Sequence, residues 1–266
     1  MISLKEWIDM KVEDGGSGIV NKANWIDGGI KVALKVLLNN SIDDNQKEKC
    51  LRELKLLRQV NHHPNINRFL GVTKGNLRKY LEINFPSLHW ENKIQMASDI
   101  THGLKYLHSK QIIHRDLHAK NILVNNGNLM ITDLGLSKHS AEIKSDSRLL
   151  GMPGYIEPQC YINHNYKQNE KSDIYSLGIL FWEISTGKPP FSEISILGII
   201  EGIREKPTEN TPFEYQQLYE NCWKNEPNQR PDIEEACRVL MQLKSQFNKN
   251  NHIKEIIHNF GDFKHQ

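Results

Sequence analysis

The stretch that decides the fold is His114-Arg115-Asp116-Leu117-His118-Ala119-Lys120-Asn121, near the middle of the chain. Seventeen residues past Asp116 the chain reads Asp133-Leu134-Gly135, after a strand-like approach. A hairpin between the two segments would bring two carboxylates and the Asn121 amide to one point. Hard divalent cations take oxygen ligands of this kind, and a carboxylate can also accept a hydroxyl proton. Asp-Leu-Gly alone predicts only a turn, but the whole string at this spacing indicates a chemical site.

The regions on either side of this stretch differ in periodicity. Upstream, residues 10–38 alternate as strands do around the turn signal Asp27-Gly28-Gly29, and residues 43–60 carry a helical apolar stripe. A long helix is expected from Trp90 to His108, and a loop-rich centre from residue 112 to about 158. Further helices are expected at residues 173–186, 194–204, 212–223 and 231–244, with a loosely packed tail from residue 247. The chain therefore predicts a small β-rich part before a larger helical part.

The composition of the 266-residue chain limits the classes of protein to consider. It is 38% hydrophobic and 25% charged, which is an ordinary globular mixture. Its 34 Lys and Arg against 32 Asp and Glu give a net charge of +2, too little for a nucleic-acid binder. The four cysteines form no CxxC pair, and neither a signal sequence nor a membrane-spanning run is evident. We therefore expect a cytoplasmic enzyme or binding module.

On these motifs the sequence resembles the eukaryotic protein kinase family, from about Val12 to Leu240. Val32-Ala33-Leu34-Lys35 is similar to the family's strand lysine motif. The resemblance implies that Lys35 contacts the ATP phosphates and that Ala33 packs near adenine. Glu53 matches the helix glutamate that pairs with this lysine. Either charge alone would be an ordinary solvated side chain, but their order along the chain favours the pair.

The resemblance also implies roles within the opening stretch. Asp116 would be the catalytic base, while Asn121 and Asp133 would bind Mg²⁺. Lys120 stands where tyrosine kinases place a cationic arginine, so it joins the catalytic set. His118 stands where serine/threonine kinases commonly carry lysine. The implied reaction transfers the γ-phosphoryl group of ATP to a protein hydroxyl, with ATP and Mg²⁺ as the expected cofactors.

Downstream signatures follow in the family's order. Residues 151–159 resemble the substrate-binding end of the activation segment, and Asp173 matches an aspartate that braces the catalytic loop. Trp223 and Arg230 match the last signature, whose arginine normally pairs with a glutamate at the end of the segment. That position is Gln159 here, so we expect only a neutral-to-charged hydrogen bond to Arg230.

Arg115 is, in this family, the arginine that usually meets a phosphate on the activation segment. Four serines between Asp133 and Gly151 could carry one, namely Ser137, Ser140, Ser145 and Ser147. A phosphoserine there would pair with the arginine and order the loop. The resemblance thus implies an upstream activating kinase or autophosphorylation, although any single serine is more simply a loop residue.

The glycine-rich segment departs from the family pattern. Gly15 and Gly18 fall where the second and third glycines belong, but Glu13 replaces the first. An acidic side chain near phosphates is repulsive unless it turns outward, and hairpins in general use glycine freely. The residues that the resemblance implies for nucleotide binding are Gly15, Gly16, Gly18, Val20, Ala33, Lys35, Asn121 and Asp133.

The largest departure is an absence at the junction of the two parts. After strand-like residues 68–74 the family has another strand and a hinge that hydrogen-bonds adenine, about fifteen residues together. Here Lys74 runs directly into Gly75-Asn76-Leu77-Arg78-Lys79-Tyr80-Leu81, which resembles the helix after the hinge. This interpretation deletes the fifth strand and the adenine anchor. The alternative is that residues 77–85 serve as strand and hinge.

These observations predict an α+β, bilobal protein-kinase-like fold. We expect a small β-rich N-lobe at residues 1–74 that lacks one strand, a larger helical C-lobe at 75–244, and a C-terminal tail at 245–266. The combination of Met152, Trp223 and the Asp173 helix is most similar to the tyrosine-kinase-like branch. That similarity implies Ser/Thr acceptors in signalling, with Tyr left open.

Three functions remain open. The first is a protein kinase, which the complete set of Lys35, Asp116, Asn121 and Asp133 favours. The second is a pseudokinase scaffold with weak or no ATP turnover, which the missing hinge and Glu13 favour. The third is a small-molecule phosphotransferase, which the activation-segment signature disfavours. We expect the first.

Overall fold

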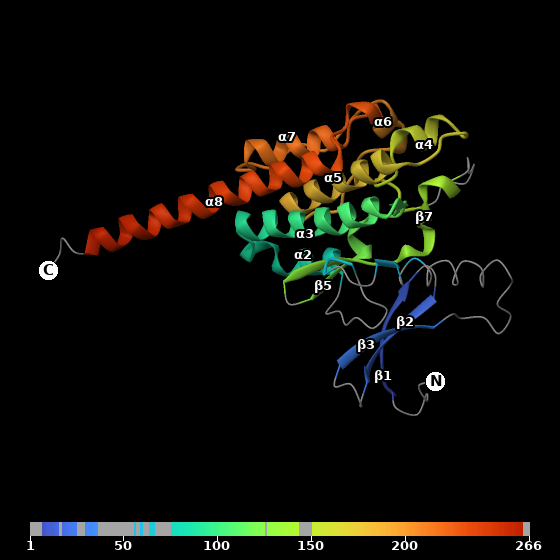
Figure 1. Ribbon diagram of the computed structural model, residues 1–266, viewed down its shortest axis with the longest axis horizontal. Coiled ribbons are helices and arrows are strands. Elements are labelled where there is room, and N and C mark those ends of the chain that lie inside the picture. The colour runs from blue at the N-terminus through green and yellow to red at the C-terminus, as the bar shows by residue number, and fades with distance from the viewer. Residues whose placement is uncertain are drawn as a thin grey trace.

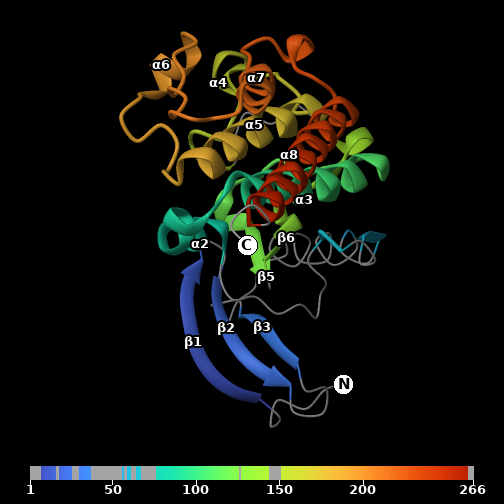
Figure 2. The same cartoon turned by 90° about the vertical axis from the view of Figure 1, so that its left-hand side faces the viewer.

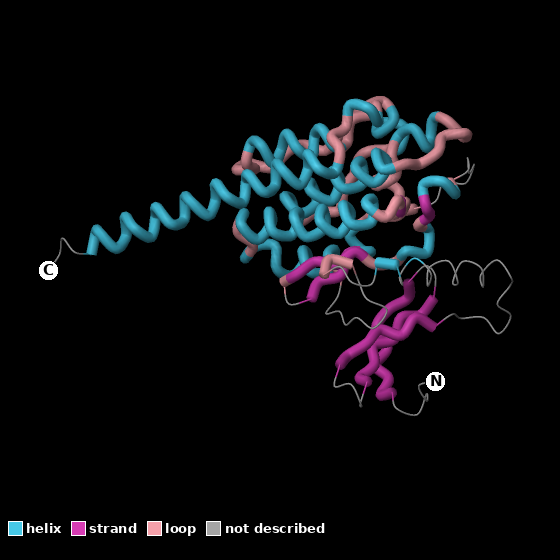
Figure 3. The backbone as a smooth tube through the Cα atoms, in the orientation of Figure 1, coloured by secondary structure: helices cyan, strands magenta, loops and turns pink. Residues whose placement is uncertain are grey.

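The computed structural model gives the chain an N-terminal sheet and a larger helical part (Figure 1). The structure describes residues 7–15, 18–25, 30–36, 56, 59–60, 64–66, 76–125, 127–143 and 151–262, with side chains from residue 56 to residue 249. Figure 3 shows the strands before residue 37 gathered in one part and helices making up most of the other. The arrangement is the expected α+β, two-part fold.

The N-terminal part is an antiparallel sheet of three strands in the order β1-β2-β3. β1 spans Trp7–Gly15, β2 spans Gly18–Trp25 and β3 spans Ile30–Val36. Gly15 pairs with Gly18 at the tip of the first hairpin. Glycine has no Cβ and can therefore adopt backbone conformations that other residues rarely adopt. The β structure expected over residues 10–38 is confirmed for the described residues. Figure 2 shows this sheet lying below the helical part.

The C-terminal part is built from helices whose ends follow local sequence signals. They are α2 Leu77–Asn84, α3 Trp90–Ser109, α4 Pro158–Ile162, α5 Glu170–Thr186, α6 Ile196–Ile200, α7 Phe213–Cys222 and α8 Ile233–Asp262. Asn76 Oδ1 accepts from the Lys79 backbone N–H at 3.1 Å and caps α2, and Asn169 caps α5 in a similar way. Gly187 ends α5 with φ of +71°, a conformation that favours glycine.

Helix α5 is the centre of the core. Every residue of α5 from Ser172 to Thr186 is buried, so this stretch of the helix has no solvent-facing side. Residues 64–66 lie against α3, because a Cβ on Gly103 would come within 2.8 Å of the Asn65 carbonyl oxygen. Within the described residues, no helix has both the length and the hydropathy needed to cross a bilayer.

One short hairpin, one pair of two-residue strands and several 3₁₀ turns occupy the loop-rich centre. β4 (Ile112–Ile113) pairs with β7 (Lys138–His139), and β5 (Ile122–Asn125) pairs with β6 (Asn128–Ile131). The 3₁₀ turns of the chain are η2 Phe85–Ser87, η3 Ala119–Asn121, η4 Leu134–Leu136, η5 Ser140–Glu142 and η6 Pro227–Gln229. Single bridges join Ile66 to Ile131 and Asn76 to Leu123. The chain therefore contacts the β5–β6 hairpin both before and after residues 67–75.

Most helices agree with the sequence prediction, and two differ in extent. α6 is shorter than the expected 194–204, and α8 continues to Asp262 through the segment expected to be a loosely packed tail. Figure 1 shows the end of α8 extending beyond the other helices. α2 is helical from Leu77, so the alternative that residues 77–85 form a strand and hinge is wrong. The expected strand at 68–74 and the hinge deletion lie outside the described residues.

Candidate active site

The loop that leads into β5 is fixed by one buried carboxylate. Asp173 of α5 accepts hydrogen bonds from the backbone N–H groups of His114 at 2.8 Å and Arg115 at 2.9 Å, and His108 Nε2 lies 2.9 Å away. Burial alone would raise the pKa of Asp173, but its hydrogen bond and electrostatic contact with His108 lower this pKa below its ordinary value. An ionised Asp173 therefore braces the loop, as the sequence predicts.

Arg115 adopts a left-handed backbone with φ of +70°, which is uncommon for a residue other than glycine. Such a conformation persists where its surroundings fix it, as Asp173 does here. The guanidinium donates from Nε to Gln168 Oε1 at 2.8 Å and from Nη1 to the Leu136 carbonyl at 3.3 Å. The pairing of Arg115 with a phosphate stays a prediction.

The serines predicted to carry that phosphate differ in access. Ser137 is fully buried and donates from Oγ to the His114 carbonyl at 3.1 Å, so it is not accessible to a kinase in this conformation. Ser140 is exposed in η5. Ser145 and Ser147 lie outside the described residues. Of the two serines that the structure describes, Ser140 is therefore the exposed one.

Asp116 and Asn121 are brought together as the sequence predicts. Asn121 Nδ2 donates to the Asp116 backbone carbonyl at 2.9 Å and to its Oδ2 at 3.2 Å. Burial raises the pKa of Asp116, and the Asp133 carboxylate raises it further, against opposing effects of His114 and Asn121. A carboxylate with a raised pKa is a better proton acceptor near neutral pH. The geometry thus suits a general base.

Asp133 follows β6 and lies close enough to Asp116 and His118 to shift the pKa of both. It adopts φ of +59°, and its Oδ1 accepts from the Gly135 N–H at 3.2 Å. Asn121 uses its Nδ2 donor on Asp116, so its Oδ1 is the acceptor that remains. In the described part of the chain, no three His, Cys, Asp or Glu side chains form a metal-binding group. An amide and a carboxylate oxygen fit Mg²⁺, which is often held by few side chains together with phosphates.

His118 belongs to this cluster although sequence reasoning did not place it among the site residues. Its Nδ1 accepts from the Asn121 backbone N–H at 3.2 Å, and its Nε2 lies 3.4 Å from Asp116 Oδ1. Burial lowers the pKa of His118 to about 4, so the ring is neutral at physiological pH. The sequence feature that could have identified His118 is its position two residues after Asp116, within the segment 114–121.

The other predicted site residues are less well placed by the structure. Lys120 is exposed on η3 and forms no hydrogen bond or ion pair with another described residue, but it lies close enough to His118 to lower the pKa of that ring. Its catalytic role stays a prediction. In the sheet, Val20 pairs with Lys35 and Lys22 pairs with Ala33. Gly16 and Glu53 lie outside the described residues.

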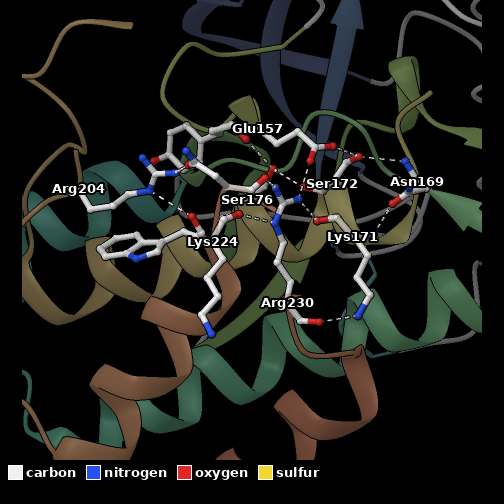
Figure 4. A network of polar contacts seen from close by, with 11 residues as sticks. Glu157, Asn169, Lys171, Ser172, Ser176, Arg204, Lys224 and Arg230 are labelled. Carbon is white, nitrogen blue, oxygen red and sulfur yellow. Dashed lines mark hydrogen bonds and ion pairs between the residues drawn. The ribbon is translucent and has the colours of Figure 1, made fainter. Parts of the chain in front are cut away.

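The ion pair at the end of the segment corrects one expectation. Arg230 pairs through Nη1 with Glu157 Oε2 at 2.5 Å, and both side chains are fully buried. The expected hydrogen bond from Arg230 to Gln159 is therefore wrong. Glu157 stands two residues earlier, directly before α4, and it also accepts a hydrogen bond from Ser172 Oγ. Figure 4 shows the guanidinium between Glu157 and the backbone that follows Lys224.

A second buried network ties the same segment to α2. Arg78 Nε lies 2.7 Å from Glu183 Oε1, and Arg78 Nη2 donates to the Tyr155 hydroxyl at 2.9 Å. The Tyr155 hydroxyl in turn donates to Glu183 Oε2. Burial raises the pKa of Glu183 to about 7, against the lowering effect of Arg78. Tyr155 also faces His118, with ring centroids 5.9 Å apart.

Comparison of the sequence with known proteins identifies its family. The family described as protein tyrosine and serine/threonine kinase matches residues 7–240. A protein of Acanthamoeba polyphaga mimivirus named as a serine/threonine-protein kinase/receptor is 32% identical over 253 residues, which are 86% of this chain and 15% of that protein.

Two relatives from cellular organisms extend the comparison. The dual specificity protein kinase pyk3 of Dictyostelium discoideum is 32% identical over 273 residues, covering 94% of this chain and 20% of that protein. The serine/threonine-protein kinase CTR1 of Arabidopsis thaliana is 27% identical over 266 residues, covering 89% of this chain and 32% of that protein. The chain thus spans between 15% and 32% of the length of these three relatives.

Proposed function

The chain belongs to the protein tyrosine and serine/threonine kinase family, and from that premise we propose that it transfers the γ-phosphoryl group of ATP to protein Ser and Thr hydroxyls in signalling. The observation that carries the proposal is the placement of Asp116 against Asn121, with Asp133 close by, on a loop fixed by Asp173. Phosphoryl transfer depends mainly on positioning and charge neutralisation, and this cluster supplies groups for both.

Asp116 and Asn121 divide the work at the acceptor side. Asp116 accepts the proton of the attacking hydroxyl, and its raised pKa, caused first by burial, favours that step. Asn121 Nδ2 holds one carboxylate oxygen and so limits the orientations of the base. Asn121 Oδ1 and Asp133 would hold Mg²⁺, which when bound neutralises charge on the phosphates.

The nucleotide contacts proposed in the sheet are supported by strand register. Gly15 lies opposite Gly18, and Val20 lies opposite Lys35. Directly opposite residues of an antiparallel pair are close neighbours, so these positions of β1, β2 and β3 form one contiguous set. Resemblance alone supports nucleotide contact by Gly16, pairing of Glu53 with Lys35, and a catalytic role of Lys120.

A small recess lies beside the base. Its lining includes Asp116, Gly151, Met152 and Tyr155. A Cβ on Gly151 would come within 3.3 Å of Asp116 Oδ1, and this glycine has φ of +117°, so a larger residue would both strain the backbone and crowd the base. The intact end of the segment, with its Glu157–Arg230 pair, disfavours a small-molecule acceptor.

The branch of the family and the acceptor residues are proposed from the similarity to named kinases. The similarity to a kinase named as serine/threonine-specific supports the tyrosine-kinase-like branch and Ser/Thr acceptors, and the similarity to a dual specificity kinase keeps Tyr among the acceptors to assay. Activation by phosphorylation of the segment and a cytoplasmic location complete the proposal. The pseudokinase alternative is disfavoured because Asp116, Asn121 and Asp133 keep a functional arrangement.

Thermal unfolding with nucleotide separates the proposal from the scaffold alternative. A ligand at 100 times its Kd stabilises a protein by about 2.7 kcal/mol, so saturating ATP with Mg²⁺ is expected to raise the Tm clearly. Asp133→Asn should reduce the part of the shift that depends on Mg²⁺. Absence of any shift with ATP and Mg²⁺ at millimolar concentration would contradict nucleotide binding and favour the scaffold.

A further inference from the structure

His118 lies in the catalytic loop, and the proposed function assigns no role to its contacts. Its side chain is only 9% exposed, although an imidazole is polar. The Nδ1 accepts a hydrogen bond from the Asn121 backbone N–H at 3.2 Å. A nitrogen that accepts carries no proton, so the single proton of the neutral ring is on Nε2. The same Asn121 N–H also donates to the His118 carbonyl at 2.8 Å, so the contact with Nδ1 is the longer branch of a shared hydrogen bond, and it favours the tautomer with the proton on Nε2.

The protonated nitrogen of this tautomer faces the base. Nε2 lies 3.4 Å from Asp116 Oδ1, a buried oxygen that has no hydrogen bond of good geometry within the described residues. The distance is long for a hydrogen bond, but contacts of this kind tighten when substrate binds. The other carboxylate oxygen, Oδ2, accepts from Asn121 Nδ2 at 3.2 Å. The Met152 backbone N–H also approaches the Asp116 carboxylate closely enough to lower its pKa.

We infer that His118 is a positioning residue, whose Nε2–H holds Asp116 Oδ1 and closes a ring of Asp116, His118 and Asn121. Around the ring, the Asn121 N–H donates to His118, His118 donates to Asp116 Oδ1, and Asn121 Nδ2 donates to Asp116 Oδ2. Both oxygens of the base then have a donor, so the carboxylate cannot rotate freely. This catalytic consequence rests on the proposed phosphoryl transfer.

A purely structural role for His118 is the competing explanation. The ring packs against Tyr155, with centroids 5.9 Å apart, so its volume alone could matter. Two substitutions separate the roles. His118→Gln keeps an N–H donor at about the reach of Nε2, whereas His118→Leu keeps apolar volume without a donor. Rescue by Gln but not by Leu points to the hydrogen bond.

Steady-state kinetics with ATP, Mg²⁺ and a protein acceptor provide the first test. We expect His118→Leu to lower kcat by up to about 100-fold, because a small misplacement of a catalytic group can cost that much. The KM for ATP should stay within about twofold, because the role inferred for the ring is to hold the base and not the nucleotide. His118→Gln should recover most of kcat. The control is His164→Leu, at an exposed histidine after α4, which should behave as wild type. Equal losses for Leu and Gln, or an unchanged kcat for Leu, would overturn the inference.

A second measurement does not depend on turnover. ¹⁵N NMR of histidine-labelled wild-type protein reports which ring nitrogen carries the proton, and His118→Gln identifies the resonance. We expect a protonated Nε2 and an unprotonated Nδ1 at neutral pH. A proton on Nδ1 would overturn the ring. A wild-type protein that transfers no phosphate would contradict the proposed function while leaving this result readable, so the two failures are distinct.

Discussion

The guanidinium of Arg230 has a partner for each of its nitrogens in a fully buried site. Nη1 pairs with Glu157 at 2.5 Å, while Nε donates to the Lys224 carbonyl at 2.8 Å and Nη2 to the Asn225 carbonyl at 3.1 Å. Buried charges are costly unless they are paired and their hydrogen bonds are satisfied. Because this pair meets both conditions, it holds the end of the segment against the chain that precedes α8.

Loss of the Glu157 charge should therefore destabilise the fold. Glu157→Gln leaves Arg230 buried opposite a neutral amide, and breaking a buried pair costs on the order of 3 kcal/mol or more. Denaturant unfolding monitored by circular dichroism measures the change. Gln159→Ala is the control and should cost much less, since Gln159 is only partly buried and does not contact Arg230. A loss for Gln159→Ala equal to that for Glu157→Gln would contradict this assignment.

Single residues also show where sequence reasoning fails. The signature for a buried pair with Arg230 was recognised, but the acid was sought at Gln159 rather than two positions earlier. The choice depends on where the backbone turns into α4, and Glu157 lies directly before that helix. Asp116 and Asn121 were predictable because their spacing lets one loop bring them together, and Asp173 was predictable because the sequence there resembles the kinase family. The packing of His118 was not, because a histidine's partners depend on its rotamer.

At the scale of elements, Glu183 links α5 to α2 and to the segment end through Arg78 and Tyr155. Its pKa is raised to about 7 from 4.5, first by burial. The folded protein therefore binds the Glu183 proton more tightly than the unfolded chain does. Its contribution to stability is fully present below pH 4.5 and is lost as the pH rises through about 7.

This linkage predicts a pH-dependent difference between wild type and Glu183→Gln. Gln cannot lose a proton, so wild type should lose stability relative to Glu183→Gln between pH 4.5 and 7, by on the order of 3 kcal/mol from the size of the pKa shift. Unfolding free energies measured across this range provide the test. A constant difference between the two proteins would show that Glu183 stays ionised beside Arg78.

The contact of α5 with α7 depends on a glycine. A Cβ on Gly178 would come within 2.6 Å of Cys222 Cβ and 3.1 Å of the Tyr219 carbonyl oxygen, so the two helices approach closely there. Gly178→Ala should destabilise the protein by about 1–3 kcal/mol because the packed helices must separate. The matched control is Gly198→Ala in α6, where the nearest atoms are side-chain atoms at 3.3 Å. Thermal unfolding should show a clearly lower Tm for Gly178→Ala alone, and equal Tm values would contradict the close approach.

Helices with a strong apolar pattern were predicted well, whereas the ends of α6 and α8 were not. The pattern from Trp90 to His108 gave α3 to within one residue. α8 runs to Asp262, and the expected tail was wrong because Ile253, Ile256, Ile257 and Phe260 keep the i, i+3, i+4, i+7 spacing of a helix. A helix already started by packed residues such as Leu240 and Leu243 adds further turns at little cost. α6 is short, and Gly202 follows it with φ of +94°, a conformation that ends a helix.

At the scale of the whole molecule, the order of the motifs predicted the two-part architecture, and α5 shows why. The Asp173 helix is buried from Ser172 to Thr186, and the catalytic loop, the segment end and Arg230 all contact it or its first turn. Motifs that are distant in sequence therefore share one support. The expected hinge deletion between the parts stays a prediction, because residues 67–75 lie outside the part of the chain that the structure describes.

The central claim is that this support presents Asp116 as the base of a phosphoryl transfer. The most direct measurement is transfer of ³²P from [γ-³²P]ATP with Mg²⁺ to a protein acceptor, by wild type and by Asp116→Ala, with folding of the variant verified by unfolding curves. We predict incorporation into Ser and Thr by wild type and a loss of about 100-fold or more in the variant, the scale of general base catalysis. Equal incorporation by the two proteins, or none by wild type, would contradict the account.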